Sequence, residues 1–190
     1  SVPEEVGENS IEDGRIFVHE NELWLSYTNS LFPATVFRSV VSYGRLTHDA
    51  QGWKVGCVIP QHGRNDFSGL EKNWVPFSHK KELWFLYLTD ERTQTFIRLD
   101  GGKVAETRLG SRLPWAWGSI HGGCIVPRED GRLLHFFSSR TNPGKPERNR
   151  YHCGVAELSP EPPFDHLRIS ERPILYGEEG YNLDKANKRF

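Results

Sequence analysis

A small set of acidic, basic and imidazole side chains carries most of the chemical potential of this sequence. Glu12 and Asp13 lie side by side before Arg15, and a second polar group spans residues 71–73. His121 begins a third group, in HGGCIV. Two carboxyl groups flanking a glycosidic bond can cleave it, one as proton donor and one as base or nucleophile. A single carboxylic acid beside cationic side chains instead suits attack by inorganic phosphate, which those cations would bind.

Both chemistries draw on the same candidates. The candidate catalytic carboxyl groups are those of Asp13, Glu12 and Glu71, and the candidate substrate or phosphate ligands are Arg15, Lys72, Asn73, Trp74 and His121. Structural roles compete with each of these. Asp13 could cap a turn, Lys72 could pair with a neighbouring glutamate, and His121 could be a satisfied structural histidine. Three tryptophans could either stack on sugar faces or pack between sheets: Trp74, Trp115 and Trp117.

The elements that must position these residues are β-strands. Short runs rich in Val, Ile, Phe, Tyr and Trp alternate with Gly, Pro, Asn and Asp, a pattern typical of an all-β fold. Twelve strands are predicted: Arg15–His19, Leu23–Thr28, Thr35–Thr47, Trp53–Pro60, Trp74–Ser78, Leu83–Leu88, Thr95–Leu99, Val104–Leu109, Gly122–Pro127, Leu133–Ser138, Tyr151–Leu158 and Leu167–Ile174.

These strands form a repeat. The run Ile16-Phe17-Val18 aligns with Val75-Pro76-Phe77 and Cys124-Ile125-Val126, and each is followed by a polar turn and a similar strand: LWLSYT, LWFLYL and LLHFFS. Four strands over roughly 50–60 residues match the blade of a β-propeller, and a sandwich of hairpins is the alternative. We therefore predict one β-propeller-like domain over residues 1–190, with blades at about 11–60, 71–110 and 119–176.

The repeat brings the chemical residues to one level. In this alignment Asp13 is level with Lys72 and His121, before the innermost strand of each blade. Innermost strands line the channel of a propeller, so these side chains would converge on one funnel. The tetrapeptide Glu-Asp-Gly-Arg recurs at Glu129–Arg132, but there it falls between two strands and predicts a hairpin turn.

Composition excludes several other functions. With 24 Lys and Arg against 25 Asp and Glu, the chain has no basic field for nucleic acid. No apolar run approaches the ~18 residues of a membrane helix. Three cysteines without a CxxC pair, and no visible signal peptide, favour free thiols and a cytoplasmic location. Scattered histidines and the absence of nucleotide or HExxH motifs predict no metal and no cofactor.

The stretches IEDGRIF, EKNWVPF, WGSIHGG and RYHCGVAELSPEPPF resemble the five-bladed β-propeller glycosidases and glycoside phosphorylases, and among them the mannoside phosphorylase/hydrolase group. The similarity runs from about Ile11 to Leu175. It implies that Asp13 is the proton donor and that Arg15, Lys72 and His121 form a pocket for phosphate or sugar hydroxyls. Gly14 stands where the family motif has proline.

Three blades are fewer than the ~4–8 that close a propeller ring. Either further blades or self-association is therefore expected to complete it. The predicted partner is a carbohydrate, with inorganic phosphate as a candidate co-substrate. Two other functions stay open: a catalytically silent propeller that binds a glycan, and a propeller with a structural or protein-interaction role.

Overall fold

The computed structural model describes residues 10–31, 38–56, 73–89, 93–141 and 150–176. The chain forms two compact units, one of Ser1–Leu88 with Thr95–Arg108 and one of Thr89–Gln94 with Leu109–Phe190. Each unit is described by itself below. The single domain predicted over residues 1–190 stays a prediction.

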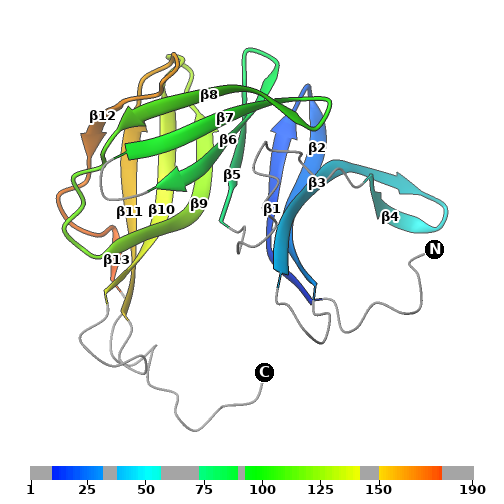
Figure 1. Cartoon of the computed structure of the whole chain (residues 1–190), viewed down its shortest axis with the longest axis horizontal. Coiled ribbons are helices and arrows are strands. Elements are labelled where there is room, and N and C mark those ends of the chain that lie inside the picture. The colour runs from blue at the N-terminus through cyan, green and yellow to red at the C-terminus, as the bar shows by residue number, and fades with distance from the viewer. Residues whose placement is uncertain (1–9, 32–37, 57–72, 90–92, 142–149, 177–190) are drawn as a thin grey trace, which may run out of the picture. The chain divides into compact units, whose positions relative to one another are not determined.

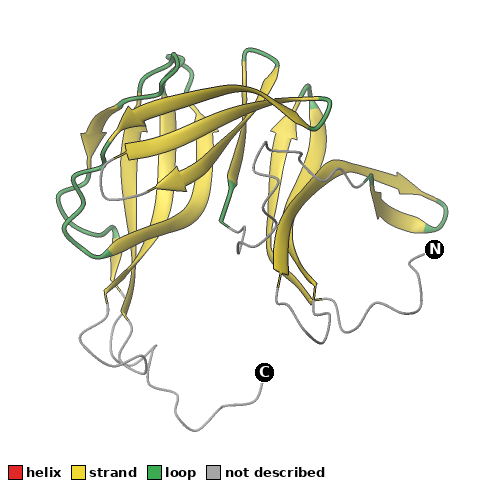
Figure 2. Cartoon of the chain, in the orientation of Figure 1, coloured by secondary structure: helices red, strands yellow, loops and turns green. Residues whose placement is uncertain are grey.

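Every regular element in the described part of the chain is a β-strand (Figure 2). The strands form three antiparallel sheets in which neighbours in sequence are neighbours in space (Figure 1). Sheet 1 contains β1 Ser10–His19, β2 Glu22–Leu31, β3 Arg38–Asp49 and β4 Gly52–Val55. Sheet 2 contains β5 Val75–His79, β6 Glu82–Thr89, β7 Thr93–Asp100 and β8 Lys103–Ser111. Sheet 3 contains β9 Ser119–Pro127, β10 Leu133–Thr141, β11 Arg150–Leu158 and β12 His166–Ile169, and β13 Leu175–Tyr176 pairs with β11. The predicted all-β class, with three four-stranded blades, is confirmed.

The first two sheets begin with the same tight hairpin. Two residues, Glu20-Asn21 in sheet 1 and Lys80-Lys81 in sheet 2, connect the first strand to the second. All four have positive φ angles, between 50° and 66°. Two consecutive left-handed residues give the turn whose twist matches that of the flanking strands. The register of both hairpins is therefore set at the turn.

Aromatic side chains from sheets 1 and 2 form the core of the first unit. Its buried residues are Val41, Tyr43, Trp74, Leu83, Phe85, Ile97 and Leu99, with Phe17 and Trp24 packed against them. Tyr43 contacts Phe85 with ring centroids 5.4 Å apart. Burial of such rings is the main source of stability for a two-sheet contact.

The second unit has its own core around sheet 3. Phe137, Leu133, Leu158 and Phe164 are each at most 2% exposed. Trp115 packs edge-on against Phe137 with centroids 4.9 Å apart. Burial alternates strictly along β10, as expected for a strand with one face in the core.

The last predicted strand, Leu167–Ile174, is divided in the structure. β12 ends at Ile169 and β13 begins at Leu175. Pro173 lies between them and has no N–H to donate to the ladder. The flanking amides of Ser170 and Ile174 donate to β11 carbonyls at 2.9 and 2.8 Å, so the segment stays attached on both sides of the proline.

No helix in the described residues is long and apolar enough to cross a membrane. Over the same residues, no group of three or more His, Cys, Asp or Glu side chains is arranged to hold a metal ion.

Candidate functional site

The first Glu-Asp-Gly-Arg stretch forms a β-bulge in β1. Glu12 pairs with Thr28 and Arg15 with Ser26, so Asp13 and Gly14 together oppose one residue of β2, Tyr27. Asp13 has a φ of 54°, in the left-handed region. Arg15 Nη1 donates a hydrogen bond of 2.9 Å to the Asp13 carbonyl oxygen and so braces the bulge.

A bulge also occurs at the equivalent place in sheet 3. His121 pairs with Ser138 and Cys124 with Phe136, so two glycines oppose Phe137. Gly122 and Gly123 have φ angles of 40° and 118°. Ser138 Oγ donates to the His121 carbonyl oxygen at 2.7 Å, which fixes the backbone just before the bulge.

The described pairing of sheet 2 contains no such bulge, but a left-handed residue precedes its first strand. Val75 pairs with Leu86 at the start of β5, and the two residues before it are Asn73 and Trp74. Asn73 has a φ of 65°, close to that of Asp13. Besides glycine, aspartate and asparagine are the residues that most readily adopt this conformation. Asp13 and Asn73 therefore share the left-handed conformation, although only Asp13 lies in a bulge of the described pairing.

The strand pairing corrects the predicted repeat register by one residue. Phe17 pairs with Trp24 in sheet 1 and Phe77 pairs with Trp84 in sheet 2, so the two phenylalanines are equivalent. Asp13 is therefore level with Asn73 and Gly122, and the alignment of Asp13 with Lys72 and His121 is wrong. Glu12 is the residue level with His121. The error arose because the triplet Ile16-Phe17-Val18 was aligned by apolar character, whereas the strand pairing makes Ile16 equivalent to Pro76 and Ile125.

The predicted site residues differ in accessibility. Glu12 and Asp13 are exposed, whereas Arg15, Asn73 and His121 are half-buried. Glu71 and Lys72 lie outside the described residues. Glu12 and His121 are each the residue directly before a bulge. The bulges of sheets 1 and 3 therefore follow an acidic and an imidazole side chain, and bulges often redirect side chains beside functional sites.

Trp74 does not offer a platform for a sugar. Its side chain is 2% exposed and belongs to the core of the first unit. Phe85 and Tyr87 approach it edge-on, at 5.6 and 5.0 Å. The predicted substrate contact of Trp74 is therefore corrected to a packing role. The residues opposite the bulges of sheets 1 and 3, Tyr27 and Phe137, are also aromatic and buried.

The other two tryptophans lie in the second unit. Trp117 packs edge-on against His152 and Tyr176, at 5.7 and 5.6 Å, and its Nε1 donates to the Glu171 carbonyl at 3.3 Å. Trp115 is mostly buried but also lines a pocket. Of the pair, Trp115 is therefore the better placed to contact a ligand.

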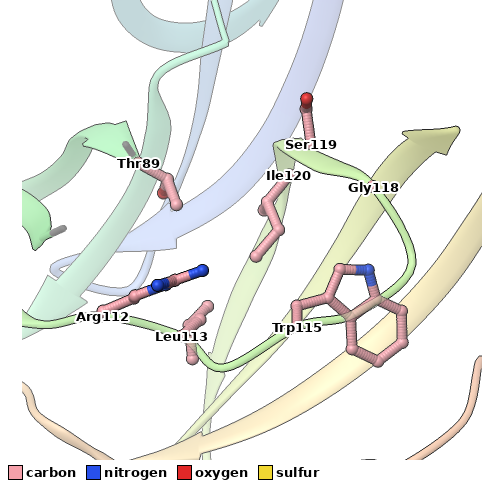
Figure 3. Close-up of a pocket in the computed structure, with 7 residues that line it drawn as sticks. All are labelled: Thr89, Arg112, Leu113, Trp115, Gly118, Ser119 and Ile120. Atoms are coloured by element: carbon pink, nitrogen blue, oxygen red, sulfur yellow. The ribbon is translucent and has the colours of Figure 1, made fainter. Parts of the chain in front are cut away.

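This pocket, within the second unit, has a volume of about 490 Å³ (Figure 3). Its walls come from the end of β6, the β8–β9 connection and the start of β9: Thr89, Arg112, Leu113, Trp115, Gly118, Ser119 and Ile120. Its size is within the usual range for small-molecule sites. Ser119 and Ile120 directly precede His121, so the pocket lies beside the bulge of sheet 3 in the chain.

Sequence reasoning missed this pocket. Trp115 and His121 were identified as candidates, but Thr89 and Arg112 were not. Arg112 follows the last residue of β8 and lies shortly before Trp115 and Trp117. A cationic side chain close to two tryptophans is a local signal for a ligand-binding loop. Thr89 is far from that loop in sequence, and no local signal connects the two.

Burial changes the titration of histidines near these features. Desolvation lowers the pKa of His135 to about 4, and its hydrogen bond to Gly122 opposes this only in part. His135 Nε2 donates to the Gly122 carbonyl oxygen at 3.4 Å, so the neutral ring contacts the bulge. Desolvation likewise lowers the pKa of His19, which hydrogen-bonds Ser78 at 3.0 Å.

The second Glu-Asp-Gly-Arg stretch is a turn, as predicted. The Gly131 amide donates to the Arg128 carbonyl at 3.0 Å, and the Arg128 amide donates to the Arg132 carbonyl at 2.8 Å. Gly131 has a φ of 82°. Arg128 and Arg132 both reach Glu157, and the Arg132 hydrogen bond, with the nearby guanidinium charges, lowers the pKa of that carboxyl group.

Comparison with known proteins gives a result at the level of the fold. No protein-family model matches the sequence, and no curated protein is significantly similar to it. A glycosyl hydrolase from Bacteroides ovatus matches with a TM-score of 0.55 at 12% identity, over 86% of this chain and 51% of the other. The Bacteroides ovatus protein described as xyloglucan PUL GH43B gives 0.55 at 13% identity, over 90% and 31%.

A third match comes from the GH130 family of mannoside phosphorylases, described as containing glycoside hydrolases that target β-1,2-mannosidic linkages in Candida mannan. Its TM-score is 0.59 at 12% identity, over 89% of this chain and 53% of the other. The chain thus spans about half, or less, of the length of these structures. Over that length its fold is that of the β-propeller glycosidases and glycoside phosphorylases, and the expected fold resemblance is confirmed.

Proposed function

We propose that this chain is part of a carbohydrate-active β-propeller that cleaves a glycoside, by hydrolysis or by phosphorolysis, with Asp13 as the proton donor. The observation that carries the proposal is the bulge found in the first strand of sheets 1 and 3. It presents Glu12 and Asp13 in one sheet and follows His121 in the other. The fold shared with glycosyl hydrolases and mannoside phosphorylases supports the same class of chemistry.

In the phosphorolytic form, Asp13 donates its proton to the glycosidic oxygen as the bond to the anomeric carbon breaks. An oxygen of inorganic phosphate then forms the new bond to that carbon, and the leaving sugar departs as an alcohol. Arg15, Lys72 and His121 would hold the phosphate, with Arg15 able to grip two of its oxygens. Asn73 would contact a sugar hydroxyl.

In the hydrolytic form, a second carboxylate activates water or attacks the anomeric carbon directly. Glu12 and Glu71 are the candidates for this role. Both Glu12 and Asp13 are exposed in this chain. A proton donor needs a raised pKa, which apolar surroundings provide. For Asp13 those surroundings must come from the bound substrate or from protein outside sheet 1.

The pocket beside β9 is the proposed binding site for part of the carbohydrate. Trp115 gives it an aromatic wall, Arg112 a guanidinium, and Thr89 and Ser119 hydroxyl groups. Stacking on an aromatic ring combined with a few polar contacts is the usual composition of such sites.

A matched pair of substitutions tests the proton donor. Asp13→Asn should abolish turnover of mannosides or other glycosides while leaving thermal unfolding unchanged, because Asn73 already occupies the equivalent position. Asp130→Asn, in the second copy of the same tetrapeptide, should leave turnover intact. Assays with and without inorganic phosphate separate phosphorolysis from hydrolysis. Full turnover by Asp13→Asn would reject the assignment, and loss only in Glu12→Gln would transfer it to Glu12.

A glycan-binding propeller without catalysis is the second candidate, favoured by the exposure of Glu12 and Asp13. It predicts that a sugar at about 100 times its dissociation constant stabilises the fold by ~2.7 kcal/mol, with no product formed. A purely structural propeller predicts neither stabilisation nor product. Thermal shift and product analysis on one glycoside panel distinguish all three functions.

A further inference from the structure

The pocket of the second unit contains a single charged side chain among the described residues that line it. That side chain is Arg112, with Thr89 and Ser119 as polar neighbours, and the rest of the described lining is apolar or glycine. In Figure 3 the guanidinium group of Arg112 points into the space between Thr89 and Ile120. The described lining therefore gives this pocket a positive charge and no carboxylate to offset it.

Arg112 differs from the arginines that surround Glu157 in the same unit. Arg128 and Arg132 lie 3.3 and 2.9 Å from the Glu157 carboxylate, which neutralises part of their charge. Within the described part of the chain, no residue accepts a hydrogen bond from the Arg112 side chain or forms an ion pair with it. The N–H donors of Arg112 are therefore available to a ligand in the pocket.

The loop that begins at Arg112 is held at both ends. Before it, the Ser111 amide donates a hydrogen bond of 2.7 Å to Asp165 Oδ1, so this carboxylate binds the backbone of the loop. At the far end, Ser139 Oγ donates to the Trp117 carbonyl oxygen at 2.9 Å. A loop that is already fixed loses little conformational entropy when a ligand binds, so the guanidinium is presented from a prepared position.

A guanidinium group selects its ligand by charge and by shape. Its forked N–H donors match two oxygens of a carboxylate or phosphate group, and such charge-assisted pairs are about twice as strong as neutral hydrogen bonds. A neutral sugar offers only uncharged acceptors. Trp115 adds an aromatic wall for the C–H groups of a sugar ring, and Thr89 and Ser119 add hydroxyl groups. The lining thus suits a sugar ring that carries an anionic group.

We propose that this pocket binds an acidic sugar unit, whose anionic group pairs with Arg112. The anion is the carboxylate of a hexuronate or the phosphate ester of a hexose phosphate, since both present paired oxygens to a guanidinium group. This assignment rests on the proposed function, because it takes the ligand to be a carbohydrate, and it adds a negative charge to the sugar unit held in the pocket.

An NMR titration of the full chain measures this preference directly. Glucuronate, galacturonate and a hexose phosphate should bind about ten- to hundredfold more tightly than glucose, galactose and mannose, the range expected for hydrogen bonds to a charged group. Arg112→Gln should remove the difference without changing the circular dichroism spectrum, because this side chain is exposed and contacts no described partner through its charge. Arg112→Lys, which keeps the charge but loses the fork, should retain part of the difference.

Arg172→Gln is the matched control, since Arg172 is an exposed arginine of the same unit that does not belong to the described pocket lining. It should retain the whole preference for acidic sugars. Binding of uronates alone, or of hexose phosphates alone, identifies the anion. Equal binding of acidic and neutral sugars, or no binding of acidic sugars, would overturn the proposal. So would binding of inorganic phosphate as tight as that of a hexose phosphate with no uronate bound, because the site would then be one for free phosphate.

Turnover assays separate this assignment from the proposed catalysis. Asp13→Asn should bind acidic sugars as the wild type does, because binding requires no proton transfer. A preference for acidic sugars without turnover of any glycoside would reject the catalytic proposal and support the pocket assignment. Turnover of neutral glycosides that Arg112→Gln leaves unchanged, with no preference for acidic sugars, would reject the pocket assignment and support the catalytic proposal.

Discussion

The tetrapeptide Glu-Asp-Gly-Arg adopts two different backbones in one molecule. At residues 12–15 the left-handed position is Asp13, with φ 54°, whereas at residues 129–132 it is Gly131, with φ 82°. The first copy is paired along its length with β2 and bulges opposite Tyr27. The second closes on itself through Arg128 and Arg132. The comparison shows that the opposing strand, rather than the tetrapeptide, decides which residue takes the unusual conformation.

The arginines also have different partners in the two copies. Arg15 donates to the Asp13 carbonyl at 2.9 Å and stabilises its own bulge. Arg132 Nη1 reaches across to Glu157 on β11 at 2.9 Å. In the first copy the arginine therefore stabilises its own bulge and leaves the carboxylates exposed. In the second copy the arginine links the turn to the neighbouring strand β11.

The largest expected effect compares the second residues of two bulges. Gly123→Ala should destabilise the protein by at least ~3 kcal/mol, because the new Cβ would lie 1.9 Å from the Phe136 carbonyl oxygen at a φ of 118°. Gly14→Ala, at the same bulge position in sheet 1, would meet only Leu25 Cδ1 at 3.8 Å. Its free energy of unfolding, measured in urea, should change by under ~0.5 kcal/mol. Equal losses would mean that the two bulges share one geometry.

A second effect of similar size depends on pH and concerns the bulge of sheet 3. His135 is buried as the neutral ring, and desolvation lowers its pKa from 6.5 to about 4. A histidine with a lowered folded pKa contributes its full stability above pH 6.5, and this is lost as the pH falls toward 4. The difference corresponds to about 3 kcal/mol. Urea denaturation between pH 7 and 4 measures it.

The control for this pH effect is His135→Leu, since the equivalent residues in sheets 1 and 2 are Leu25 and Phe85. This variant should keep the wild-type fold at pH 7 and lose the part of the acid sensitivity that His135 causes. An unchanged pH profile in His135→Leu would assign that sensitivity to other groups, such as His152, whose pKa burial also lowers.

Sequence alone predicted the turn but not the bulge. Asp130-Gly131 lies between two apolar runs, and that local signal is sufficient for a hairpin connection. The bulge depends on which residue of β2 opposes Asp13, and pairing of this kind has no local signature. The one-residue register error had a similar origin, because the cross-strand pairs Phe17–Trp24 and Phe77–Trp84, which fix the equivalence, cannot be read from either strand alone.

The candidate site was also predictable only where a local sequence signal exists. The repeat of apolar triplets was enough to place Asp13, Asn73 and His121 near the start of the first strand of each sheet. Trp74 was misassigned because an aromatic residue beside polar ones suits both a sugar platform and a core. The pocket was missed because Thr89, at the end of β6, and Arg112, in the β8–β9 connection, come from distant parts of the sequence.

A smaller effect compares the left-handed residues of the two copies. Gly131→Ala should cost about 1–2 kcal/mol, because a φ of 82° strains any residue with a Cβ although the nearest atom, on Pro160, is 4.0 Å away. Asp13→Gly should change the free energy of unfolding by under ~0.5 kcal/mol, since glycine relieves the strain and adds freedom to the unfolded chain. Thermal and urea unfolding would both detect a reversal of this order.

The smallest effect concerns the aspartates themselves. Asp130 Oδ1 accepts the Arg132 amide at 3.1 Å, and its other oxygen lies 3.2 Å from Arg128 Nη2, but all three side chains are substantially exposed. Exposed pairs contribute little, so Asp130→Ala should cost about 0.5–1 kcal/mol, and less in high salt. Asp13→Ala should cost a similar amount that does not depend on salt, because its origin is backbone strain rather than a charge pair. Urea denaturation at low and high salt separates the two origins. A salt-sensitive loss at Asp13 would mean that its carboxylate, like that of Asp130, has a structural partner, and would weaken its assignment as a proton donor.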